Sequence, residues 1–145
     1  TYRFAELEES VMNIAKKTGT EKEAIKNLKE IKYFMNEGRL AIKEKGLNKS
    51  TVLVHFFQVP FLEEMEIPAY AIFGPAPLEP KQILAVKDAR VDIIIDNAHN
   101  PVGGPMRELM KNAEYILLIN FPGLNNTRTI ADVIRHNIDQ LINAH

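Results

Sequence analysis

Four polar residues of the types that bind cations or move protons follow apolar runs in this sequence. His55 comes at the end of "TVLVH", Asp96 at the end of "VDIIID", and Asn120 at the end of "EYILLIN", while His99 lies three residues after Asp96. Imidazole nitrogens and carboxylate or amide oxygens are ligands of divalent metal ions. Asp96 and His99 could instead act as an acid–base pair in a small enzyme.

Each of these residues also has a structural interpretation. A single histidine at a strand end is often only a hydrogen-bonded structural residue. Asp96 and Asn97 could cap the next turn, and Asn120 could simply begin a loop. The sequence "VGGP" at 102–105 has two glycines but neither the lysine nor the spacing of a phosphate-binding loop, so we exclude a phosphate site there.

The apolar runs that carry these residues are short, nearly continuous and rich in β-branched side chains. Such runs are typical of strands buried on both faces of a parallel sheet. They occur at 51–57, 69–73, 91–96 and 114–120, and helical patterns separate them. Strands that alternate with helices indicate an α/β fold with a four-stranded, mostly parallel sheet flanked by helices. Ligands of such sheets bind beyond the carboxyl ends of the strands, so the four polar residues should share one edge.

The first 46 residues have a different pattern. Apolar residues at helical spacing predict an amphipathic helix over 2–17, which Gly19 ends, and a long backbone helix over 21–45. Thr20 and Glu23 have the spacing of a capping box for the second helix. We therefore divide the chain into a helical segment, residues 1–46, and an α/β lobe, residues 47–145.

Composition excludes several functions. A formal net charge of −1 and the absence of tryptophan give no support for nucleic-acid binding. With no cysteine in the chain, disulfides, thiolate metal sites and cysteine nucleophiles are excluded. The apolar runs are shorter than the roughly 20 residues that span a membrane. The chain opens on "TYRFAELEES" without a methionine, so we expect further residues upstream.

The order of these elements resembles the zinc- and manganese-binding receptors of ABC importers, which have two α/β lobes joined by a rigid backbone helix. The resemblance covers nearly the whole chain, from the last helix of the first lobe to the end of the second. The matching stretches are "VLVHFFQVPFLEEMEIPAYAIFG", "LEPKQI", "VDIIIDNAHNP", "YILLINFPG" and "IRHNIDQL".

The resemblance implies that the second lobe supplies two metal ligands. His55 would be one of them, although Phe56 stands where the family has an aspartate. Asn120 stands where the family has its ligand aspartate, and an amide oxygen carries no negative charge, so zinc or manganese affinity should be weakened. Asp96 and His99 are further candidates for the ligand cleft. The two remaining ligands would come from a first lobe upstream of Thr1.

The leading hypothesis is therefore a non-enzymatic solute receptor, with a metal ion as its expected solute. The resemblance implies an ABC permease as its partner, a missing N-terminal lobe, and a location in the periplasm or on the outer face of the cell membrane, with any membrane association through an upstream anchor. A metal chelate such as haem or a corrinoid could replace the bare ion as solute. Two different functions also fit the residues: the small enzyme using Asp96 and His99, and an interaction module that docks a partner on the long helix.

Overall fold

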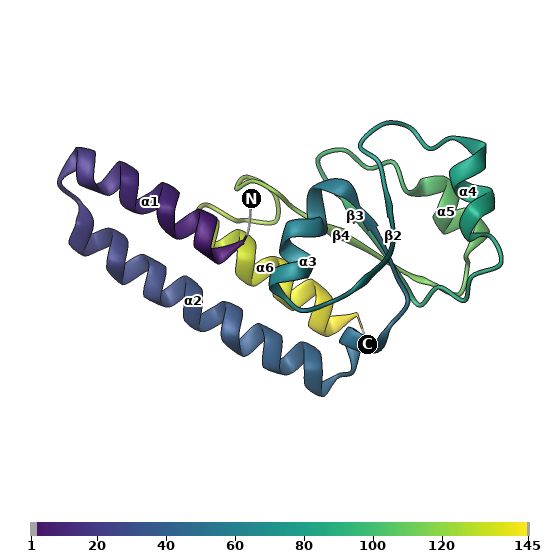
Figure 1. Cartoon of the computed structure of the whole chain (residues 1–145), viewed down its shortest axis with the longest axis horizontal. Helices are drawn as coiled ribbons and strands as arrows, with labels where there is room; N and C mark the ends of the chain where they lie inside the picture. Colours follow the sequence, from purple (N-terminus) through teal and green to yellow (C-terminus); the bar gives the residue numbers. More distant parts are fainter. Residues whose placement is uncertain (1–2, 145) are drawn as a thin grey trace.

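The chain begins with two antiparallel helices that form a long hairpin (Figure 1). A computed structural model describes residues 3–144, so the predicted helix start at residue 2 and the terminal residues 1 and 145 lie outside the described residues. Helix α1 spans Phe4–Thr18 and α2 spans Glu21–Glu44. Gly19 joins them in the left-handed conformation at φ 70°, which confirms it as a helix stop.

The predicted capping box at the start of α2 is wrong. Thr20 is the N-cap residue, but its side chain makes no cap hydrogen bond. Its hydroxyl instead lies 2.8 Å from the hydroxyl of Thr18, at the end of the preceding helix. In the tight turn between the two helices, the Thr20 hydroxyl therefore contacts Thr18 and does not cap α2.

A four-stranded sheet follows, and all of its strand pairs are parallel. The strands are β1 (Val52–His55), β2 (Ala69–Phe73), β3 (Ile93–Asn97) and β4 (Glu114–Leu118), in the order β2-β1-β3-β4. Short 3-10 turns, Leu47–Lys49 and Phe56–Gln58 (η2), flank β1. The structure confirms the predicted α/β class.

Helices cover both faces of the sheet. On one face, α3 (Val59–Glu64) and α6 (Ile130–Asn143) pack over alternate strand residues such as Val54 and Ile95, and α2 adds residues to the same apolar core. On the other face, the short helices α4 (Pro80–Val86) and α5 (Gly104–Leu109) cover Leu53 and Ile94 (Figure 1). This double cover explains why the central strands are apolar at every position except their ends.

The long helix meets the sheet domain through α6. Gly38 of α2 faces Ile138 of α6 so closely that an added Cβ would lie 2.8 Å from Ile138 Cδ1. Asn137, the residue before Ile138, is buried, and its side-chain amide makes two hydrogen bonds to the backbone of Ile119, just after β4. It accepts from the Ile119 N–H at 3.0 Å and donates to the Ile119 carbonyl at 2.9 Å. Helix α6 therefore fixes both the long helix and the exit of β4.

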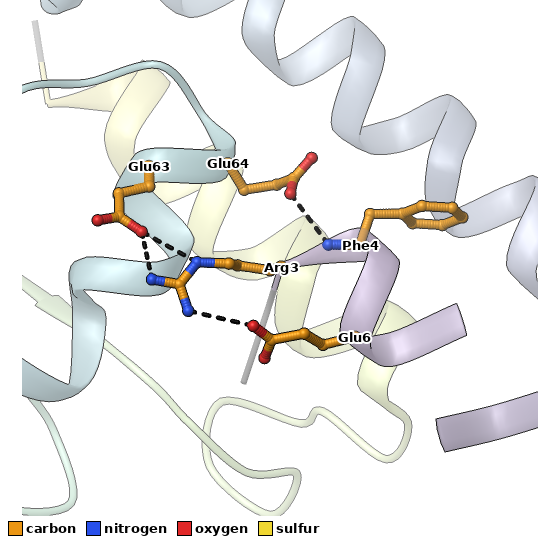
Figure 2. A network of polar contacts seen from close by, with 5 residues as sticks. All are labelled: Arg3, Phe4, Glu6, Glu63 and Glu64. Carbon is orange, nitrogen blue, oxygen red and sulfur yellow. Dashed lines mark hydrogen bonds and ion pairs between the residues drawn. The ribbon is translucent and has the colours of Figure 1, made fainter. Parts of the chain in front are cut away.

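A second connection joins the start of the hairpin to α3 (Figure 2). The Arg3 guanidinium donates to Glu63 and to Glu6, and the Phe4 N–H donates to Glu64 at 3.0 Å. The other carboxylate oxygen of Glu64 accepts from Arg39 of α2 at 2.9 Å. Glu64 thus caps the first turn of α1 and links it to α2, which holds α1, α2 and α3 together.

Within the described residues, none of the helices is both long enough and apolar enough to cross a lipid bilayer.

We predict that Gly38→Ala destabilises the protein by about 1 kcal/mol. Helix propensity alone favours alanine by about 1 kcal/mol, but overpacking against Ile138 costs about 1–3 kcal/mol. Urea unfolding of Gly38→Ala, Ile138→Val and the double variant measures the coupling. The double variant should be more stable than the sum of the single effects, because valine lacks Cδ1. A Gly38→Ala protein more stable than the wild type would contradict the close approach.

Candidate functional site

The parallel strands bring the four predicted residues to one edge of the sheet. His55 is the last residue of β1, Asp96 is the penultimate residue of β3, and His99 lies in the loop that follows it. Asn120 lies two residues beyond the end of β4. The structure therefore places all four at or just beyond the carboxyl ends of their strands, where ligands of α/β sheets bind.

His55 lies at this edge, but its ring is completely buried rather than open to a cleft. Its Nδ1 accepts the N–H of Phe57 at 3.1 Å, and its ring lies against Phe57 and Phe73, with centroids 5.2 and 5.7 Å away. A backbone N–H can only donate, so Nδ1 is unprotonated and the neutral ring carries its proton on Nε2. Burial lowers the pKa of His55, although Asp96 opposes this, and the lowered pKa favours the same neutral form.

The Nε2–H of His55 points beneath Gly74, directly after β2. An added Cβ on Gly74 would lie 2.7 Å from Nε2, and this glycine has φ +71°. Nε2 has no hydrogen-bond partner among the described residues. A metal ion would need the lone pair of this nitrogen, so coordination there requires the proton to move to Nδ1 and the bond to Phe57 to break. The only sequence signal for Gly74 is the "GP" that follows a strand, which indicates a turn.

Asp96 is buried and holds the loop that follows β3. Its carboxylate accepts the N–H groups of Asn97, Val102 and Gly103, at 2.8, 3.4 and 2.7 Å, and the hydroxyl of Tyr115 on β4. Burial and the nearby Asp96 carboxylate raise the pKa of Tyr115, which keeps this phenol protonated as a donor. These donors occupy the carboxylate, so the hydrogen bonds of Asp96 do not build the hypothetical acid–base pair with His99.

His99 and Asn120 link the segments that follow β1, β3 and β4. The Nδ1 of His99 accepts the N–H of Asn120 at 3.3 Å, and its ring meets Phe121 edge-on with centroids 5.2 Å apart. The side-chain oxygen of Asn120 accepts from Gln58 of η2 at 2.8 Å. The segments that leave β1, β3 and β4 are therefore fastened to one another by side chains.

A cavity of about 410 Å³ opens beside these contacts. Its apolar wall consists of Phe56, Phe57, Val59, Pro60 and Phe121, and its polar groups are Arg3 and Asn120. The exposed fractions of Phe56, Phe57 and Phe121 are 54%, 43% and 62%. We did not identify these phenylalanines from the sequence; the only signal was an aromatic residue directly after a strand-end polar residue, in "HFF" and "NF".

Arg3 reaches the cavity from the hairpin, and carboxylates flank its guanidinium (Figure 2). Its Nε donates to Glu63 at 3.0 Å, and its Nη1 lies 3.3 Å from Glu6. No three or more His, Cys, Asp or Glu side chains gather into a metal-binding group anywhere within residues 3–144.

Comparisons with known proteins identify the fold. No protein-family model and no curated protein matches the sequence. Among solved structures, the Cd-bound periplasmic metal binding protein from Candidatus Liberibacter asiaticus has a TM-score of 0.70 and 13% identity, covering 97% of this chain and 58% of its own. The substrate-binding protein FpvC from Pseudomonas aeruginosa, in complex with Ni²⁺, has a TM-score of 0.68, 16% identity and the same coverage.

This chain has the fold of part of a periplasmic metal binding protein. The Mn-bound form of the Candidatus Liberibacter asiaticus protein superposes equally well, with a TM-score of 0.70. The resemblance predicted from the order of the strands and helices is thereby confirmed at the level of fold. The chain spans 57–58% of the length of these structures.

We predict that the buried His55 makes stability fall in mild acid. Its folded-state pKa is lowered. As the pH falls below about 6.5, the His55 imidazole therefore binds a proton in the unfolded chain but not in the native protein. The free energy of unfolding should then decrease by up to about 1.4 kcal/mol per pH unit. In His55→Asn the Oδ1 atom can still accept the Phe57 N–H, but nothing titrates. Urea unfolding from about pH 7.5 to 5 should give a flatter profile for the variant, and parallel profiles would contradict the prediction.

Proposed function

We propose that this chain is the solute-holding part of a receptor that delivers its ligand to an ABC importer. The observation that carries the proposal is that side chains link the segments after β1, β3 and β4 at the carboxyl edge of the sheet. His99, Asn120 and Gln58 tie three strand exits into one surface beside a cavity of ligand size. The match of the fold to a periplasmic metal binding protein over 97% of the chain supports the same function.

The proposal includes a location and partners. The chain would work in the periplasm or on the outer face of the cell membrane, where importer receptors meet their permease. Because the similar structures are longer than this chain, a further lobe would face the carboxyl edge and close the site. Membrane association would come only through an anchor upstream of the residues described.

A non-enzymatic role agrees with the chemistry of the edge. Asp96 and His99 are the acid–base pair that the sequence suggested. The carboxylate of Asp96 instead holds the loop from Asn97 to Gly103, and the imidazole of His99 accepts from the backbone of Asn120. Both side chains are therefore engaged in positioning loops.

A divalent ion, zinc or manganese in particular, is the solute implied by the family resemblance, and the similar structures hold Mn²⁺, Cd²⁺ or Ni²⁺. His55 and Asn120 fit such an ion poorly. His55 presents a proton on Nε2, and the neutral amide oxygen of Asn120 is engaged by Gln58. Metal binding in this chain should consequently be weak.

Crosslinking in intact cells of the native source tests the receptor role. Mass spectrometry should find crosslinks between exposed lysines of this chain and the permease subunit of an ABC importer. A spectrum of crosslinks confined to cytosolic proteins would contradict both the location and the role.

We predict that Asn120→Asp raises the affinity for Mn²⁺ at least tenfold. The variant supplies an anionic oxygen that can still accept from Gln58, and a unit charge about 4 Å from another contributes about 4 kcal/mol at an effective dielectric constant of about 20. Calorimetric titration measures the change. Asn112→Asp is the matched control, because it adds the same charge at an exposed position before β4, at the opposite edge of the sheet. Equal effects of the two variants would show that only net charge matters.

A further inference from the structure

The two candidate histidines of this edge, His55 and His99, each support a phenylalanine. His55 accepts the N–H of Phe57 and packs against its ring, with centroids 5.2 Å apart. His99 accepts the N–H of Asn120 and meets the next ring, Phe121, at the same centroid distance of 5.2 Å. In this chain both imidazoles therefore use their Nδ1 lone pair to fix a strand exit, and a ring of that exit lies against each.

The supported rings line one cavity from two directions. Phe57 and its neighbour Phe56, with ring centroids 5.9 Å apart, follow β1, whereas Phe121 follows β4. Single exposed apolar residues are normal on a protein surface, but a contiguous group around a concavity indicates a binding site. A cavity of about 410 Å³ is within the range of small-molecule sites and far larger than a bare ion needs.

The polar groups of the cavity offer little net charge. Arg3 is its one charged lining residue among those described, and the carboxylates of Glu63 and Glu6 oppose that charge (Figure 2). Asn120 contributes a neutral amide whose oxygen is already hydrogen-bonded to Gln58. Aromatic walls with few polar groups favour flat apolar molecules, which gain from offset or edge-to-face contact with the rings.

We propose that the solute of this edge is a planar, largely apolar organic molecule, held between Phe56 and Phe57 on one side and Phe121 on the other. This inference rests on the proposed receptor function and names the class of its solute. His55 and His99 act as positioning residues for the rings, and Arg3 and Asn120 are the polar residues that line the cavity.

Binding of 1-aminoanthracene, a neutral planar fluorophore, tests the proposal on the full chain. Its emission should rise saturably, with one molecule bound per chain. Phe121→Ala should weaken binding about tenfold, because it removes one wall of the cavity. The matched control is Leu84→Ala on α4, since Leu84 is as exposed as Phe121, at 60% against 62%, and does not line the cavity. Circular dichroism of each variant confirms that it is folded.

A second variant tests the supporting role of the histidine. His99→Asn keeps an oxygen that can accept the N–H of Asn120 but removes the ring that meets Phe121. It should weaken binding of the fluorophore less than Phe121→Ala does, and in combination with Phe121→Ala it should add nothing. Additive losses would overturn the assignment of His99 as a support for Phe121.

The outcomes separate this inference from the receptor function. Fluorophore binding that is unsaturable, or that Phe121→Ala and Leu84→Ala weaken equally, would overturn the aromatic site. Micromolar binding of Mn²⁺ without binding of the fluorophore would also overturn it, yet would leave the receptor function standing. Permease crosslinks in cells report on the receptor function whatever the fluorophore does.

Discussion

The parallel direction of all four strands is the constraint on which the rest of the structure depends. Every strand ends at the same edge, and the two central strands, β1 and β3, are buried along their whole length. Where such strands end, backbone N–H groups lose their partners in the sheet and need other acceptors. Asp96 meets this need after β3 by accepting three N–H groups, and His55 meets it after β1. These two polar side chains at the edge are therefore already used to accept backbone hydrogen bonds that stabilise the fold.

The sequence predicted the elements well, because their signals are local. Continuous β-branched runs identified the strands, and apolar residues at helical spacing identified α1 and α2. The position of the polar residues at one edge followed from the topology. Their roles did not follow, because these depend on contacts between distant residues, such as Tyr115 with Asp96 and Gln58 with Asn120, which lie 19 and 62 positions apart. Nothing in the sequence indicates that Nδ1 of His55 accepts the N–H of Phe57.

The similar structures suggest a metal ion as ligand, but the side chains at this edge do not favour one. A fold sets where a ligand can bind, whereas side chains decide which ligand binds. The similar structures hold divalent ions, whereas here His55 carries its proton on the nitrogen that is not hydrogen-bonded. Asn120, at the position where the family resemblance implies an anionic ligand, is a neutral amide. At the same edge, Phe56, Phe57 and Phe121 present exposed rings. In this chain the edge therefore offers more exposed apolar surface than charge.

The cavity is also connected to the helical hairpin. Arg3 lines the cavity, and from there Glu63 and Glu64 connect the start of α1 to α3, while Arg39 extends the connection to α2. Helix α2 in turn packs tightly on α6 at Gly38, and α6 holds the exit of β4 through Asn137. The two walls of the cavity, after β1 and after β4, are therefore braced against the same long helix. Wide opening of one wall from the other would break these hydrogen bonds and the close packing at Gly38. Under the proposed receptor function, a solute would therefore enter by small shifts of the rings and of the loops that carry them.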